Sequence, residues 1–158
     1  MKRRIAPEQT PVTPGRPTVR VADLDEVYTG RLVLKGYVER NADGTYGVVV
    51  SKNLTEGERR LMLARADVMA KTDALRGSGS RCHAFFDRDA RESTKSIDET
   101  AARLLMPGRD VRNAYRRLVI PLSASVAKSL GLPLPIVQTR LRQLGILQTC
   151  IDAPWGRF

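Results

Sequence analysis

Residues 30–51 carry the pattern that most restricts the fold of this chain, because it predicts two strands joined by a tight turn. Apolar or small residues alternate with mostly polar neighbours, as in a half-buried strand, at Leu32, Leu34, Gly36 and Val38. The segment Asn41-Ala42-Asp43-Gly44 follows, and Asn, Asp and Gly tolerate the left-handed backbone of tight turns. The β-branched run Val48-Val49-Val50 predicts the returning strand. An antiparallel hairpin is therefore expected.

A helix is predicted to begin at Thr55, since Glu58 three residues later completes a capping-box pattern. Its apolar stripe has helical spacing and consists of Leu61, Ala64, Val68 and Leu75. The segment Gly77-Ser78-Gly79-Ser80 is expected to end this helix as a flexible loop. Residues 81–93 mix Arg and Asp around Phe85 and Phe86, and this pattern predicts neither a helix nor a strand.

Four further helices are predicted. The first starts at Ser93 or Ser96, stops at Pro107-Gly108 and directs four apolar side chains inward: Ile97, Ala101, Leu104 and Leu105. The others span 109–119, where Pro121 limits the C-terminus, then 123–130 and 135–144. The expected class is α+β, with a small antiparallel hairpin or sheet packed on four to five helices.

The two ends of the chain lack such periodicity. Residues 1–20 contain four of the nine prolines and several basic residues, which predicts an extended, flexible basic arm that is dispensable for folding. Residues 148–158 form a tail without a period. One folded domain is therefore expected over residues 21–147.

Composition excludes several classes of protein. The 27 Lys and Arg against 17 Asp and Glu give a net charge of +10, which favours a polyanionic partner: nucleic acid or an acidic protein. The single histidine, His83, excludes a zinc site with two histidines, and two cysteines are too few for a disulfide framework. No apolar run is long enough for a membrane span, so a cytoplasmic protein with reduced thiols is expected.

Four segments in order resemble the ImmA/IrrE-like metallopeptidases, which regulate repressors of phages and mobile elements or stress responses. These segments are the second strand over 46–54, the helical segment Glu58-Arg59-Arg60-Leu61-Met62-Leu63-Ala64, the run Ala101-Ala102-Arg103-Leu104-Leu105-Met106-Pro107, and a final helix pair over 126–146. The resemblance covers residues 26–147 and implies a zincin-like scaffold.

The metal-binding positions of that family are replaced in this chain. Where the resemblance places HExxH, the sequence has Arg65-Ala66-Asp67-Val68-Met69, so Arg65 and Met69 stand for the histidines and Ala66 for the general base. The region of the third ligand holds Thr94 and Ser96. A zinc hydrolase needs three ligands and a base, and Arg65 puts a fixed cation where the dication would lie. We therefore expect a pseudoenzyme with no metal and no cofactor, in which Arg65 pairs with an acid such as Asp98.

Residues 123–144 approximate a helix-turn-helix. Ala127 is a small residue four positions before Gly131 in the turn, Pro135 suits a first helical turn, and Val137 and Leu141 would anchor the second helix. Its outward side would present Gln138, Thr139 and Arg142 to base edges, while phosphates would be contacted by Arg109, Arg112, Arg116 and Arg117. The alternative is that these helices only pack within the scaffold.

The leading hypothesis is an inactive ImmA/IrrE-like regulator of a phage or other mobile element that binds DNA or a repressor-type protein and so controls transcription. One alternative is a divergent peptidase or hydrolase with a rebuilt site around Cys82 and His83, with Asp87 and Asp89 nearby. Another is an inhibitor of an acidic host protein, with the arm folding on contact. Sequence alone does not separate DNA from an acidic protein as the partner, since both attract a positively charged chain.

Overall fold

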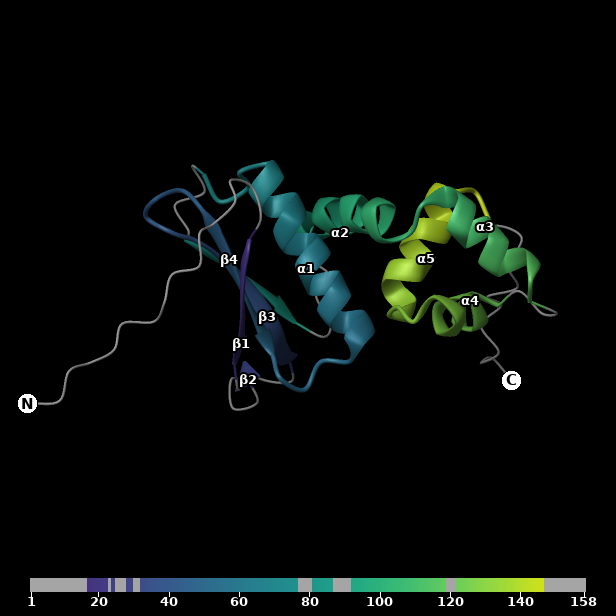
Figure 1. Cartoon of the computed structure of the whole chain (residues 1–158), viewed down its shortest axis with the longest axis horizontal. Helices are drawn as coiled ribbons and strands as arrows, with labels where there is room; N and C mark the ends of the chain where they lie inside the picture. Colours follow the sequence, from purple (N-terminus) through teal and green to yellow (C-terminus); the bar gives the residue numbers. More distant parts are fainter. Residues whose placement is uncertain are drawn as a thin grey trace, which may run out of the picture.

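The computed structural model describes residues 17–22, 24, 28–29, 32–76, 81–86, 92–118 and 122–146. The strands are β1 (Thr18–Ala22), β2 (Tyr28–Thr29), β3 (Leu32–Arg40), β4 (Tyr46–Ser51) and β5 (Cys82–Phe86). The helices are α1 (Glu56–Lys71), α2 (Glu92–Leu105), α3 (Gly108–Arg116), α4 (Ser123–Leu130) and α5 (Leu134–Gln143). The class is therefore α+β, as predicted. In Figure 1, α1 lies against the sheet, α3, α4 and α5 gather away from it, and α2 runs between the two groups.

The predicted hairpin is confirmed, and it forms the centre of a larger mixed sheet. β3 and β4 are antiparallel, and their turn contains Gly44 at φ 85°. β1 pairs with β4 in parallel, whereas β2 and β5 pair with β3 antiparallel. The predicted alternation of burial is confirmed, since Leu34, Gly36 and Val38 are buried and their neighbours in β3 are partly exposed. The β3–β5 pairing shifts register between Leu34 and Gly36. Leu34 packs in a small cluster with Leu24 and Val49, whereas Val38 belongs to the cluster between the sheet and α1.

Three strands were not predicted from the sequence: β1, β2 and β5. The flexible arm was predicted to extend to residue 20, and this boundary is wrong, because Thr18–Arg20 belong to β1. β5 occupies part of the segment for which the sequence predicted no structure, and its Phe85 is fully buried. Residues 1–16, the loop 77–80 and the tail 148–158 lie outside the described residues.

Helix α1 begins as predicted. The Thr55 side chain accepts a hydrogen bond from the Glu58 backbone N–H, and Glu58 caps the Thr55 N–H in return. The helix ends at Lys71, so Leu75 lies beyond it and packs with the sheet instead of extending the helical stripe. Asp73, at φ 46°, turns the chain after the helix.

The remaining helices follow their predictions, with shifted ends. α2 begins at Glu92, so Ser93 and Ser96 lie inside it, and Leu104 is 47% exposed instead of directed inward. The helix expected over 109–119 ends at Arg116. α4 has the predicted bounds, and α5 begins one residue earlier than expected.

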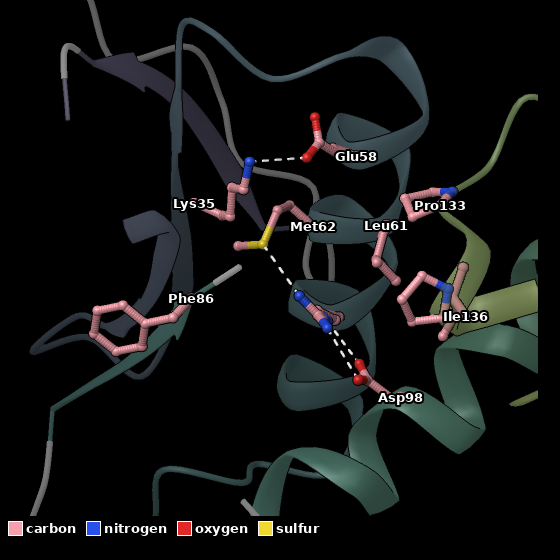
Figure 2. A pocket seen from close by; sticks show the side chains of 10 residues that line it. Lys35, Glu58, Leu61, Met62, Phe86, Asp98, Pro133 and Ile136 are labelled. Carbon is pink, nitrogen blue, oxygen red and sulfur yellow. Dashed lines mark hydrogen bonds and ion pairs between the residues drawn. The ribbon is translucent and has the colours of Figure 1, made fainter. Parts of the chain in front are cut away.

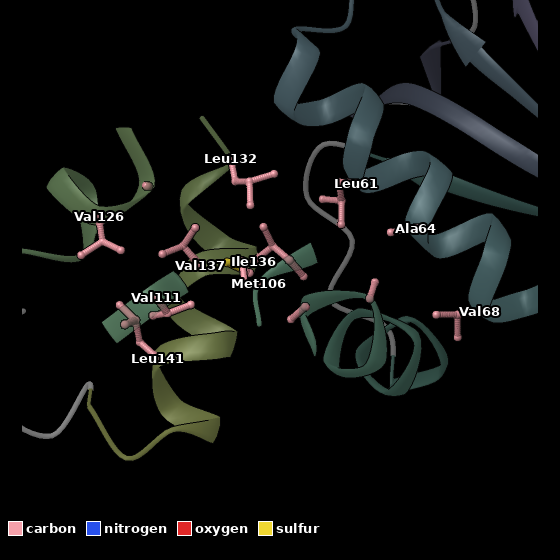
Figure 3. Packing of buried hydrophobic residues seen from close by; sticks show 13 residues of the cluster. Leu61, Ala64, Val68, Met106, Val111, Val126, Leu132, Ile136, Val137 and Leu141 are labelled. Atoms are coloured by element: carbon pink, nitrogen blue, oxygen red, sulfur yellow. The ribbon is translucent and has the colours of Figure 1, made fainter. Parts of the chain in front are cut away.

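Two faces of α1 join the sheet to the helices. Met62, Ala66 and Met69 pack with the strands, whereas Leu61, Ala64 and Val68 belong to the cluster that runs through α2 to α5 (Figure 3). The predicted stripe contained only the second of these faces. Arg65 falls between the two faces on the helical surface, which places its side chain at the seam between the two clusters.

Candidate functional site

Arg65 forms the ion pair that the sequence predicted. Its Nε donates to Asp98 Oδ1 at 2.6 Å and its Nη2 donates to Asp98 Oδ2 at 2.9 Å, so the contact is bidentate (Figure 2). The Arg65 and Asp98 side chains are 11% and 21% exposed. Planar guanidinium and carboxylate groups match in this geometry, which makes such pairs both strong and directional.

Other side chains enclose the guanidinium of Arg65. Its Cζ lies 4.6 Å from the centre of the Phe85 ring on β5, within the range of a cation–π contact. Its Nη1 donates to Met62 Sδ at 3.8 Å. Sequence reasoning missed Phe85, because β5 was not predicted.

The residues at this place do not fit a zinc ion. Arg65 offers no lone pair, and Ala66 and Met69 are buried in the cluster between α1 and the sheet. Thr94 is buried, and its Oγ1 has no hydrogen-bond partner in the described part of the chain. Ser96 is exposed, and both oxygens of Asp98 bind Arg65. Among the described residues, no group of three His, Cys, Asp or Glu side chains could hold a metal.

A pocket of about 130 Å³ opens beside the Arg65–Asp98 pair (Figure 2). Residues from β3, α1 and β5 line one part of it, and Pro133, Pro135 and Ile136 line the part next to α5. At its other charged edge, Lys35 Nζ lies 2.9 Å from Glu58 Oε1. Burial alone would raise the pKa of Glu58, but the Thr55 N–H and Lys35 hold it below its ordinary value. Lys35 was not predicted as part of a site.

The predicted cysteine–histidine pair lies on β5. Cys82 is exposed and His83 is half-buried, with its ring centroid 4.7 Å from that of Phe85. Partial burial, and then the negative charge of Glu39, raise the pKa of the Cys82 thiol above its ordinary value. A raised pKa reduces the thiolate fraction that a nucleophile needs. Asp87, Asp89 and Cys150 lie outside the described residues.

Helices α4 and α5 are joined by a short turn, at the place where the sequence predicted a helix-turn-helix. Gly131 follows α4 at φ 61°, the left-handed region that favours glycine, and Pro135 lies in the first turn of α5. Ala127, Val137 and Leu141 are buried, as the pattern predicted. A Cβ on Gly57, in the first turn of α1, would collide with the Gly131 carbonyl oxygen, so α1 directly contacts the turn of this pair.

The predicted base-contacting residues lie at spacings that share one face of α5, but they differ in exposure. Arg142 is exposed. Gln138 is half-buried and its Nε2 donates to Ser123 Oγ at 3.5 Å, whereas Thr139 Oγ1 donates to the Pro135 carbonyl at 3.1 Å. Two of the three side chains therefore also have contacts within the fold.

The predicted phosphate-contacting residues are all exposed on α3 or directly after it: Arg109, Arg112, Arg116 and Arg117. They belong to a strongly uneven charge distribution. Residues 17–100, the sheet region, contain 14 Lys or Arg and 14 Asp or Glu. Residues 101–146, the helical region, contain eight Lys or Arg and Asp110 as the one acid.

Comparison of this chain with protein-family models and with curated proteins gives no match. Within the described residues, no helix has the length and apolar character needed to cross a membrane.

Proposed function

We propose that this protein is a non-catalytic regulator on an ImmA/IrrE-like, zincin-like scaffold that binds DNA through its helical region. The observation that carries the proposal is the bidentate Arg65–Asp98 pair at the position where the resemblance places the metal helix. A guanidinium held there by a carboxylate and enclosed by Phe85 and Met62 takes the place of one metal ligand, while Met69 and Ala66 take the places of the second histidine and the general base.

The binding half of the proposal is supported by the excess of arginine beside the helix-turn-helix pair. In this arrangement the arginines of α3 contact phosphates and fix the domain on the duplex, while Arg142, with Gln138 and Thr139, faces base edges. Such a protein acts in the cytoplasm, where bacterial DNA and its repressors are found.

The test is binding to a mixture of duplex fragments over a salt series, with the metal content measured on the same sample. We expect at least one fragment to bind more tightly at physiological salt than the roughly 10⁻⁴ to 10⁻⁶ M of non-specific association. Arg116→Gln should weaken binding to all fragments and reduce the salt slope by about one. Arg142→Gln should act on the preferred fragment, by on the order of 1–3 kcal/mol.

Arg76→Gln is the matched control. Arg76 lies in the sheet region, its side chain is 79% exposed, and its ion pair with Asp73 is long at 3.7 Å. This variant removes one positive charge without touching the helical region. If no fragment binds above the non-specific level, the DNA proposal is wrong and a repressor-type protein becomes the partner to test. Stoichiometric zinc, or peptidase activity of the purified wild-type protein, would contradict the non-catalytic half.

A further inference from the structure

Arg140 of α5 is held in place where α2 ends and α3 begins. Its Nε donates to the Met106 carbonyl at 2.8 Å, and its Nη1 donates to Gln143 Oε1 at 3.1 Å. Gln143 is itself fixed, since its Nε2 donates to the Glu99 carbonyl at 2.9 Å. A Cβ on Gly108 would lie 3.7 Å from Arg140 Nη2, so the first residue of α3 approaches the guanidinium closely.

Two further arginines project from the helix faces that pack on this part of α5. Arg103 follows Glu99 by one helical turn of α2, and Arg112 follows Gly108 by one helical turn of α3, so each lies on the face of its helix that meets α5. Partial burial, and then the positive charges of Arg103 on α2 and Arg112 on α3, lower the pKa of Arg140 from its ordinary value. Arg103 and Arg112 are both exposed. None of the three forms an ion pair with an acid in the described ranges, where all the ion pairs belong to the sheet region. The fold thus brings together three like charges, an arrangement that an external anion would stabilise.

We propose that Arg103, Arg112 and Arg140 form a phosphate-binding site that holds a backbone phosphate of the bound nucleic acid. This inference rests on the proposed function and extends it from α3 to the junction of α2, α3 and α5. Guanidinium groups bind phosphate oxygens in a directional, bidentate manner, and Arg140 is already ordered by its hydrogen bonds. A polymer fits better than a free anion, because Arg109 and Arg116 continue the row of cations along α3.

The experiment measures duplex binding over a salt series with the full chain and with Arg103→Gln, Arg112→Gln and the control Arg76→Gln. Arg140 is left unchanged, because its hydrogen bonds stabilise the fold. We expect Arg103→Gln and Arg112→Gln each to reduce the salt slope by about one, and Arg76→Gln to leave it unchanged. Circular dichroism and the melting temperature show that each variant is folded.

The outcomes separate this inference from the proposed function. If Arg116→Gln weakens binding while Arg103→Gln behaves like Arg76→Gln, the protein binds DNA but the three-arginine site is wrong. A second arm measures thermal unfolding with added inorganic phosphate. If the wild type binds no duplex, the phosphate in this site does not come from a nucleic acid. In that case, if phosphate raises the melting temperature of the wild type but not of Arg103→Gln, the site binds a free anion. If phosphate stabilises neither protein, the three-arginine site is wrong as well.

Discussion

Charged side chains have opposite surroundings in the two regions of this molecule. In the sheet region, which is balanced in charge, basic side chains pair with nearby acids in Lys35–Glu58, Arg40–Asp73, Arg65–Asp98 and Lys71–Asp67. In the helical region the arginines of α3 are exposed and Asp110 is the one acid. Charges that are paired and partly buried contribute to the fold, whereas exposed like charges attract a partner of opposite charge. The comparison teaches that net charge alone does not locate a binding surface.

The largest expected effect is loss of the central ion pair of the sheet region. Asp98→Asn removes the carboxylate from a guanidinium that is 11% exposed, and we expect it to lower the free energy of unfolding by about 3 kcal/mol. Urea unfolding measures this change. The double variant Arg65→Met/Asp98→Leu should recover most of the loss, since it removes both charges.

Arg116→Gln is the matched variant in the helical region, and we expect it to change stability by less than about 0.5 kcal/mol. Equal destabilisation by Asp98→Asn and Arg116→Gln would remove the distinction between the two regions.

The contact between the regions is tested by Gly57→Ala. The new Cβ would collide with the Gly131 backbone, which cannot move aside as a flexible side chain can. We expect a loss of about 1–3 kcal/mol in unfolding free energy. Gly47→Ala is the control, because the three atoms nearest to its Cβ all belong to the Glu39 side chain, the closest at 3.2 Å, and none is backbone. If both variants unfold at the same urea concentration, α1 does not depend on its contact with the turn.

Removal of β1 tests the boundary of the sheet region. A chain that begins at Pro17 keeps the parallel pairing of Thr18–Ala22 with Gly47–Ser51, whereas a chain that begins after Ala22 loses it. We expect the chain that begins at Pro17 to be as stable as the full chain. The chain that begins after Ala22 should lose on the order of 2 kcal/mol in unfolding free energy, since it lacks the backbone hydrogen bonds between β1 and β4. Thermal unfolding of the two truncated chains decides. An unchanged melting temperature in the shorter chain would restore the earlier expectation that residues 1–20 are dispensable for folding.

Among the variants that are expected to change stability, the smallest effect is a gain at Thr94. Its buried hydroxyl has no hydrogen-bond partner among the described residues, so Thr94→Val replaces an unsatisfied polar group with an apolar group of similar shape. We expect a gain of about 1 kcal/mol in unfolding free energy. Ser96→Val is the control on the exposed side of α2 and should gain nothing. A loss of stability in Thr94→Val would mean that the hydroxyl has a partner after all.

Much of the candidate site was predictable from sequence, for reasons that differ between its parts. The Arg65–Asp98 pair was predicted from the resemblance, which placed Arg65 in the metal-helix position opposite the segment of Thr94 and Ser96, where Asp98 is a nearby acid. The bounds of α4 and the glycine turn after it followed from local chemistry. The three-arginine junction was not predictable, because Arg103 and Arg140 lie far apart in sequence and only the packing of α2 on α5 brings them together.

The sequence by itself determined the elements whose energy is local. The Asn41–Gly44 turn, the Thr55–Glu58 capping box and Gly131 each act through neighbouring backbone, so their residues suffice to predict them. Tertiary structure decided the rest. β1 is a strand because it pairs with β4, and β5 is a strand because it pairs with β3. Leu75 is buried because the sheet packs against it, whereas Leu104 stays exposed because none of the described elements covers it. Such pairings depend on distant partners, and no local window of sequence contains both sides of the interaction.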